Sequence, residues 1–177
     1  MSYFAAAVVR SDGHWSALPI SLADAADGEE VADRLRDVDP SADVSLLFLE
    51  SDDEYLAILR LDKGEDPRVF GSDVAFAEES RVGALLLGAE PRSAVEIDAE
   101  LTSPASPDDE PLMGAADPGD PGIAEPVGDP ALLVDLGVSA TRLLELCGNK
   151  AMRASDITAE VCMAIGAGDE VEELREA

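Results

Sequence analysis

The sequence predicts an α+β fold, with a mostly antiparallel sheet and one or two helices at the N-terminus, an acidic linker, and a small all-α helical bundle at the C-terminus. Three observations predict it. Short apolar runs alternate with turn residues in the first half, residues 90–127 are rich in Pro and acidic residues, and helix signals fill the remainder. The expected organisation is an α+β domain (1–89), a disordered linker (90–127) and a helical subdomain (128–177).

Hairpin signals support the antiparallel sheet. Asp12-Gly13 is a hairpin turn signal, because a type I′ turn needs positive φ at both central residues. Ser51–Glu54 separates two apolar runs and predicts a second hairpin with a strongly acidic tip. The expected strands are Tyr3–Val9, His14–Leu18, Val44–Leu49, Tyr55–Leu61 and a short Arg68–Phe70.

Two helices are expected beside this sheet. Asp27 and Glu30 have the spacing of a capping box, and a buried stripe follows at i, i+4 and i+7. That stripe consists of Val31, Leu35 and Val38. A second helix is capped by Ser72 or Asp73 and runs to about Arg81. The run Val82–Leu87 fits a further helical turn or a buried strand, since short apolar runs do not decide between them.

The linker is predicted from its composition. Residues 90–130 hold 11 acidic residues, Arg92 as the single base, no aromatic residue and most of the prolines. Such a segment buries too little apolar area to offset the entropy of ordering, and its charges repel one another.

Capping signals define four short helices after the linker. The first begins at Asp129-Pro130 and ends at Gly137, because Pro suits the first turn and Gly the position after the last. The next three are expected to begin at Ser139, at Ser155 and near Gly168-Asp169. Residues 128–177 are too few to form more than a marginal hydrophobic core. The bundle is therefore expected to pack on the first domain or on a partner.

The net charge of −27, from 39 acidic and 12 basic residues, restricts the partners. Phosphate backbones and anionic membranes repel such a chain, whereas a basic protein is its natural electrostatic partner. No segment approaches the about 20 apolar residues of a membrane span. The N-terminus lacks the basic region of a secretory signal, so the expected location is the cytoplasm, with reduced cysteines. Coding bias, solubility or a salt-adapted host would equally explain the acidity.

No catalytic, metal or cofactor site is predicted. His14 is the single histidine and has no nucleophile motif beside it, so it is interpreted as a strand residue. Cys147 and Cys162 lack the further ligands of a zinc site and fit buried thiols. The acidic turns do not match the Ca²⁺-loop pattern.

The predicted partner-binding surface is the two acidic turns and their surroundings. Arg68 is a rare cation there and is expected to bond Asp66 or Asp73. The candidate residues are Asp52, Asp53, Glu54, Asp62, Glu65, Asp66, Arg68 and Asp73. The alternative is an enzyme or small-ligand site with convergent polar groups around Arg60, Arg68 and Asp73.

Several stretches together resemble one actinobacterial family. They are Tyr3–Val8, Asp52–Tyr55, Asp66–Phe70 with Ser72-Asp73, Arg81–Gly88, Val127–Pro130 and Leu143–Cys147. The chain resembles tRNA adenosine deaminase-associated proteins, a family named for gene adjacency to the enzyme that makes inosine at the tRNA wobble position. The resemblance implies no activity, and the H-x-E and P-C-x-x-C stretches of a zinc deaminase are absent.

The resemblance and the charge together predict a non-enzymatic accessory protein. Its expected partner is a basic protein, with tRNA adenosine deaminase as the candidate, and its expected effect is on wobble-adenosine editing. It would act as a mimic that regulates access to the basic surface, or as an assembly or solubility factor. An adaptor unrelated to the deaminase is the remaining alternative.

Overall fold

The computed structural model describes residues 3–63, 67–87, 125–149 and 151–177. A six-stranded sheet lies at its centre in the order β2-β1-β3-β4-β5-β6, and every neighbouring pair is antiparallel. The strands are β1 (Tyr3–Ser11), β2 (His14–Pro19), β3 (Val44–Ser51), β4 (Tyr55–Asp62), β5 (Arg68–Gly71) and β6 (Val127–Gly128).

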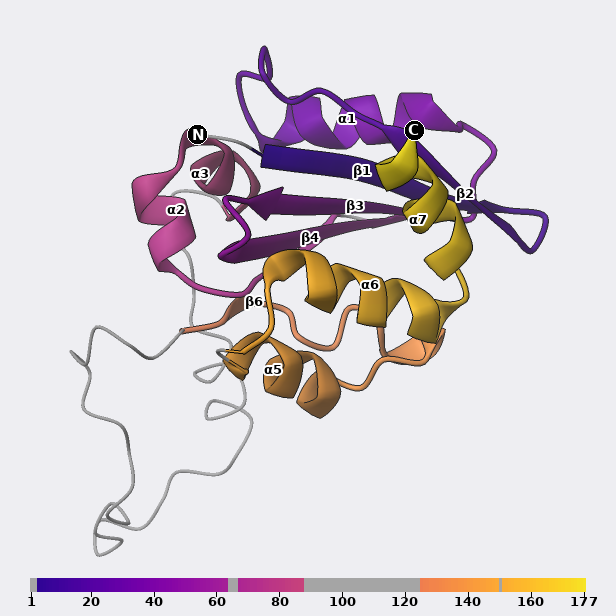
Figure 1. Cartoon of the computed structure of the whole chain (residues 1–177). Coiled ribbons are helices and arrows are strands. Elements are labelled where there is room, and N and C mark those ends of the chain that lie inside the picture. Colours follow the sequence, from indigo (N-terminus) through magenta and orange to yellow (C-terminus); the bar gives the residue numbers. More distant parts are fainter. Residues whose placement is uncertain (1–2, 64–66, 88–124, 150) are drawn as a thin grey trace, which may run out of the picture.

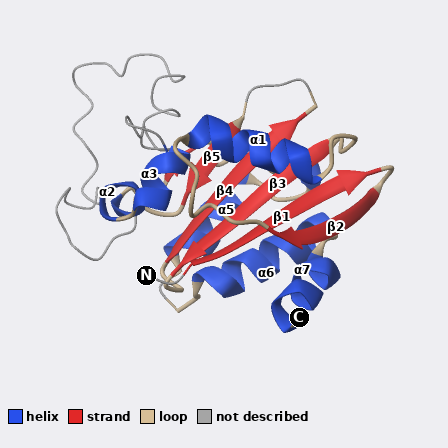
Figure 2. Cartoon of the chain, turned by 90° about the horizontal axis from the view of Figure 1, so that it is seen from above, coloured by secondary structure: helices blue, strands red, loops and turns tan. Residues whose placement is uncertain are grey.

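Helices cover both faces of the sheet, which gives three layers (Figures 1 and 2). One face carries α1 (Gly28–Val38), α2 (Ala75–Glu79) and α3 (Arg81–Leu87). The other carries the 3₁₀ helix η1 (Val134–Leu136), α5 (Ala140–Gly148), α6 (Ala154–Ile165) and α7 (Gly168–Glu176). None of these described helices is both long and apolar enough to cross a bilayer.

The predicted α+β class and all five predicted strands are confirmed, each strand being one or two residues longer than expected. Asp12 and Gly13 have φ values of 52° and 81°, as the β1–β2 turn requires. Every residue of β3 is buried, because helices cover both of its faces. The four consecutive apolar residues Leu46–Leu49, in place of an alternating pattern, follow from this double cover.

In the first helix layer, α1 follows its capping signals. The Asp27 carboxylate accepts a bond from the Glu30 N–H at 2.9 Å, while Glu30 accepts from the Ala26 N–H rather than from Asp27. The second expected helix does not follow its signals: α2 (Ala75–Glu79) has Val74 at its N-cap position in place of Ser72 or Asp73, and it ends before Arg81. The ambiguous run after α2 is helical and forms α3. Gly83 permits the tight α2–α3 packing, because a Cβ there would lie 2.2 Å from the carbonyl oxygen of Phe76.

Three boundary predictions after residue 124 differ from the structure. Val127 belongs to β6, which pairs with β5, so the expected linker ends too late. The first expected helix is only turns and η1, although Gly137 (φ 109°) ends it as predicted. Ser155 does not cap α6: the helix begins at Ala154, and Asp156 accepts a bond from the N–H of Arg153 at 3.2 Å. Ser139 caps α5 as expected.

The C-terminal helices pack on the sheet. Phe48, Ile58 and Phe70 from the strands share one buried cluster with Leu143 and Val161 from the helices. The C-terminal helices therefore form a hydrophobic core together with the sheet. This is one of the two outcomes expected for them. The division into domains at 1–89 and 128–177 stays a prediction, and residues 90–124 of the predicted linker lie outside the described residues.

Candidate functional site

The first acidic turn is the tip of the β3–β4 hairpin. Asp52 and Asp53 have φ values of 50° and 60°, and both side chains are exposed with that of Glu54. The carbonyl oxygen of Asp53 accepts a hydrogen bond from the N–H of Ala154 at 3.0 Å, and its carboxylate lies 4.0 Å from the guanidinium of Arg153. The start of α6 thus holds this tip in place.

Asp73 joins the same end of the sheet, because β5 runs antiparallel to β4. The pKa of Tyr55 responds to the negative charge at this end of the sheet. Its burial, the hydrogen bond that it donates to Glu79 at 3.2 Å, and the charges of Asp73 and Glu54 raise the pKa of its hydroxyl. We call Asp52, Asp53, Glu54 and Asp73 the hairpin-tip cluster.

The second acidic turn lies at the other end of β4, where Glu65 and Asp66 are outside the described residues. Arg68 bonds Asp62 at 3.1 Å and lies 3.8 Å from Asp129. Of the two partners expected for Arg68, Asp73 lies at the opposite end of β5, and Asp66 lies outside the described residues. Asp73 instead accepts a bond from the Ala75 N–H at 3.0 Å, in the first turn of α2.

A buried arginine organises this second end. Arg60 is 3% exposed, and its guanidinium donates to Asp62 at 2.7 and 3.0 Å and to Asp135 at 2.5 and 2.7 Å. It also donates to the carbonyl of Leu132 at 2.5 Å. The hydrogen bonds from Arg60 hold the pKa of Asp135 below its usual value. The sequence signal for this network is a single cation within the apolar run of β4.

The candidate residues therefore divide between two places. β4 has eight residues, so the hairpin-tip cluster and Asp62 are separated by roughly 23 Å at 3.3 Å per residue. The alternative site around Arg60, Arg68 and Asp73 is not brought together, and Arg60 is saturated by its own partners. Within the described residues, no group of three His, Cys, Asp or Glu could hold a metal ion.

The histidine and the two cysteines do not form a catalytic group in the described structure. His14 is exposed on β2. Burial raises the pKa of the thiols of Cys147 and Cys162 to about 12, so both are protonated at neutral pH. Both cysteines contact the core between the sheet and the C-terminal helices. Cys162 is therefore a small apolar residue of the core, and Cys147, which is half-buried, packs against the same core.

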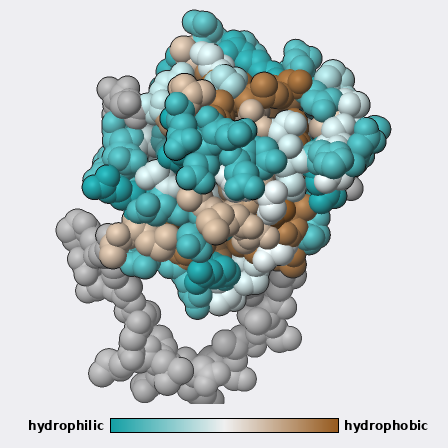
Figure 3. Space-filling model, turned by 45° about the vertical axis from the view of Figure 1, so that its right-hand side comes forward, coloured by the Kyte–Doolittle hydropathy of each residue, from teal (hydrophilic) through white to brown (hydrophobic). Residues whose placement is uncertain are grey.

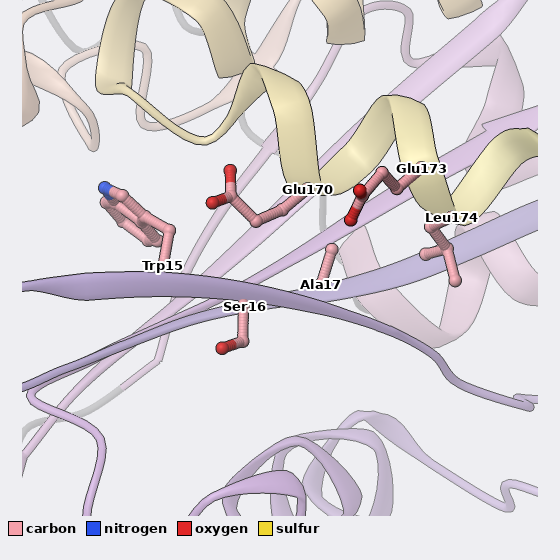
Figure 4. A pocket seen from close by; sticks show the side chains of 6 residues that line it. All are labelled: Trp15, Ser16, Ala17, Glu170, Glu173 and Leu174. Carbon is pink, nitrogen blue, oxygen red and sulfur yellow. The ribbon is translucent and has the colours of Figure 1, made fainter.

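The grooves on the described surface include two that adjoin the sheet. The larger, of about 360 Å³, lies between β2 and α7 (Figure 4). Its lining residues are Trp15, Ser16, Ala17, Glu170, Glu173 and Leu174. The smaller, of about 260 Å³, lies near the end of α1 and includes Arg36, Asp39, Asp62 and Lys63. Sequence reasoning missed the β2–α7 groove, because its two sides are about 150 residues apart in the chain.

The face of the molecule seen in Figure 3 is mainly hydrophilic, with smaller apolar areas between the polar ones. Many basic side chains in the described part are already paired with acidic ones. These pairs are Arg34–Glu30, Arg36–Asp33, Arg60–Asp62, Arg60–Asp135, Arg68–Asp62, Arg142–Glu160, Arg153–Asp53 and Arg175–Glu50. The acidic residues left over give the molecule its negative field.

Comparison with known proteins gives one match. No curated protein and no solved structure is similar enough to count as one. The model of a family described as Rv3753c-like tRNA adenosine deaminase-associated protein matches residues 3–168. That match spans both helix layers, all six strands and most of the C-terminal helices. The chain therefore belongs to the family of Rv3753c-like tRNA adenosine deaminase-associated proteins.

Proposed function

We propose that this chain is a non-enzymatic accessory protein that binds the tRNA adenosine deaminase and modulates its action on tRNA. The carrying observation is the net charge of −27 over the whole chain, together with the internal ion pairs that neutralise many of the cations in its described part. A tRNA-binding enzyme needs clustered Lys and Arg for phosphate contacts. An acidic surface is complementary to such a patch and is attracted to it. The family description supports association with this enzyme.

The hairpin-tip cluster is the proposed centre of contact. Its acidic side chains project at a tight turn that the start of α6 supports, so little ordering entropy is lost on binding. Competition with tRNA for the basic surface would lower the rate of editing. An assembly or solubility role would instead leave that rate unchanged or raise it, and an editing assay with added chain distinguishes the two.

The test is a calorimetric titration of the purified chain against the deaminase from the same organism. The complex is expected at low ionic strength and is expected to weaken at about 0.15 M salt, where the screening length falls to about 8 Å. A triple variant of the hairpin tip, Asp52→Asn/Asp53→Asn/Glu54→Gln, should weaken binding by about tenfold or more.

The matched control removes three charges elsewhere. Glu29, Asp33 and Asp37 are exposed and lie at i, i+4 and i+8 on α1. The variant Glu29→Gln/Asp33→Asn/Asp37→Asn should retain most of the affinity. Absence of any complex at low ionic strength would overturn the proposal. Equal losses of affinity in the two triple variants would indicate that binding depends on the overall charge and not on contact at the hairpin tip.

A further inference from the structure

The outer edge of β2 is open for hydrogen bonding. Ile20 donates to the carbonyl of Ala5 at 3.2 Å, which fixes the alternation of the β1–β2 ladder. His14, Ser16 and Leu18 therefore direct their backbone groups to β1, while Trp15 and Ala17 direct theirs outward. No other described strand pairs with this edge. Pro19 stands at the next outward position, where a missing N–H costs no ladder bond.

The β2–α7 groove runs along this open edge. Trp15 and Ala17 point from β2 toward α7, and Glu170 and Glu173 point back toward the strand (Figure 4). Neither glutamate forms an ion pair or side-chain hydrogen bond within the part of the chain that the structure describes. The groove thus combines two carboxylates and an aromatic ring beside an unpaired strand edge.

The opposite face of β2 carries His14, Ser16 and Leu18, of which only Leu18 is apolar. Leu18 is 43% exposed, and its side chain lies on the face of β2 away from α7. A strand added to β2 would place alternate side chains on these two faces. One row would enter the groove, and the other would lie beside Leu18.

We propose that β2 accepts an extended segment of the basic partner as a seventh strand, with Lys or Arg side chains in the β2–α7 groove and apolar side chains beside Leu18. The open backbone groups supply the affinity, and the two faces supply the selectivity. Lys or Arg pairs with Glu170 and Glu173 while its stem covers the ring of Trp15. The guanidinium of Arg10 already lies 5.6 Å from the centre of that ring, so it occupies one part of it.

The charge on α7 selects this occupant over a second copy of the chain. Five acidic residues lie on α7, namely Asp169, Glu170, Glu172, Glu173 and Glu176, and its one base, Arg175, is bonded to Glu50. Pairing two β2 edges would bring two such helices together in molecules that each carry −27. Like charges placed so close destabilise a complex.

The inference rests on the proposed function in taking the deaminase as the partner, and the first experiment uses that enzyme. Trp15 is the only tryptophan, so the chain labelled with 5-fluorotryptophan gives one fluorine NMR signal from the groove. That signal should shift when the unlabelled deaminase is added. Ala17→Pro removes an outward N–H without changing charge, and Glu170→Gln/Glu173→Gln removes the two groove carboxylates. Each should weaken binding by about tenfold or more.

The matched control is Glu172→Gln/Glu176→Gln, which removes two charges from the same helix outside the groove lining. It should leave the affinity within about twofold of the original. Binding that survives both groove variants and leaves the Trp15 signal unmoved would overturn the inference while the proposed function stands. A dimer of the free chain in sedimentation that Ala17→Pro abolishes would also overturn it, because the occupant would then be a second copy.

A second experiment tests the inference even if the deaminase does not bind and the proposed function fails. Its probe is a short synthetic peptide of alternating Lys and Val, with alternating Glu and Val as its control. The Lys peptide should change the Trp15 fluorescence saturably, and Ala17→Pro should reduce that affinity. No saturable change with the Lys peptide, or equal changes with both peptides, would overturn the inference.

Discussion

Arg60 is a buried charged residue that joins the two halves of the chain. It lies on β4 among buried apolar residues, and its two carboxylate partners, Asp62 and Asp135, come from the two halves of the chain. A buried guanidinium is stable only when hydrogen bonds replace its water, and here they do. Removing it leaves Asp135 and the carbonyl of Leu132 without this donor, and leaves Asp62 with Arg68 as a partner.

Arg60→Met should therefore lower the free energy of unfolding by about 2 kcal/mol, because hydrogen bonds to charged groups are lost while the carboxylate of Asp135, which is 60% exposed, regains water. Urea unfolding followed by circular dichroism measures it. The control is Arg36→Met, whose pair with Asp33 is exposed and should cost less than about 1 kcal/mol. Equal losses in the two variants would contradict the role given to Arg60.

The same pair predicts a pH dependence. Arg60 lowers the pKa of folded Asp135 below 3.8, its value without partners. Asp135 thus binds more protons when the chain is unfolded, so its stabilisation is present above pH 3.8 and is lost as the pH falls through the folded value. The stability difference between the original chain and Arg60→Met should shrink below about pH 4. A constant difference from pH 7 to pH 3 would contradict this.

The cysteines give a chemical prediction at the same scale. Burial raises the pKa of Cys147 and Cys162 to about 12, and the thiolate is the reactive form. At pH 8 both should react with a thiol reagent far more slowly in the folded chain than in denaturant. Absorbance of the released thiolate measures the two rates. Rapid reaction of Cys162 in the folded chain would show that α6 is not packed as described.

Among the elements, α7 depends on one charged contact. Val171 is buried, and the guanidinium of Arg175 bonds Glu50 of β3 and lies 4.8 Å from the ring of Phe4. Glu50 is only 4% exposed, so its charge needs this partner. The contact holds the helix over β2 and thereby forms one wall of the β2–α7 groove.

Arg175→Ala should destabilise the chain by about 3 kcal/mol, because it leaves the Glu50 carboxylate buried and unpaired. Adding Glu50→Gln should recover part of this loss, since the neutral amide is less costly to bury. Trp15 fluorescence in urea measures it, because α7 lies over that ring. A double variant that is no more stable than Arg175→Ala alone would contradict the pairing.

Elements with strong local signals could be predicted from the sequence, and those set by long-range contacts could not. The turn at Asp12-Gly13 and the cap at Asp27 depend on neighbouring residues, so their signals are local. β6 is two residues long and exists only because β5 offers an edge. Arg68 could be recognised as unusual, but its partner Asp129 follows the long segment between the two halves.

In the candidate site, too, features with local sequence signals could be predicted and features set by long-range contacts could not. The acidic tip at Asp52–Glu54 could be predicted, because it lies between two apolar runs. The β2–α7 groove could not, since it combines Trp15 with Glu170 through the packing of the last helix on the first hairpin. No periodicity within either segment indicates which face the other will cover.

Repulsion among the negative charges affects the stability of the whole molecule. A net charge of −27 on 177 residues destabilises the compact state, and salt screens that repulsion. Raising NaCl from about 10 mM to about 0.5 M should therefore raise the melting temperature by about 5 °C or more. Differential scanning calorimetry measures it.

The control for the salt effect reverses two charges. Glu172→Lys/Glu176→Lys makes the net charge four units less negative on an exposed part of α7. The variant should show a smaller rise in melting temperature with salt. An equal rise in both chains would indicate that salt acts on apolar burial rather than on charge.

The position of the second helix layer at the end of the chain has a consequence during synthesis. The sheet face formed by Leu46, Phe48 and Ile58 is covered only by residues from Leu132 onward. About eighty residues separate the end of α3 from Val171, which takes a ribosome roughly 4–17 s to translate. For that time the nascent chain exposes half of its aliphatic core. The acidic segment translated in the interval adds net negative charge, which is expected to keep the unfinished chain soluble.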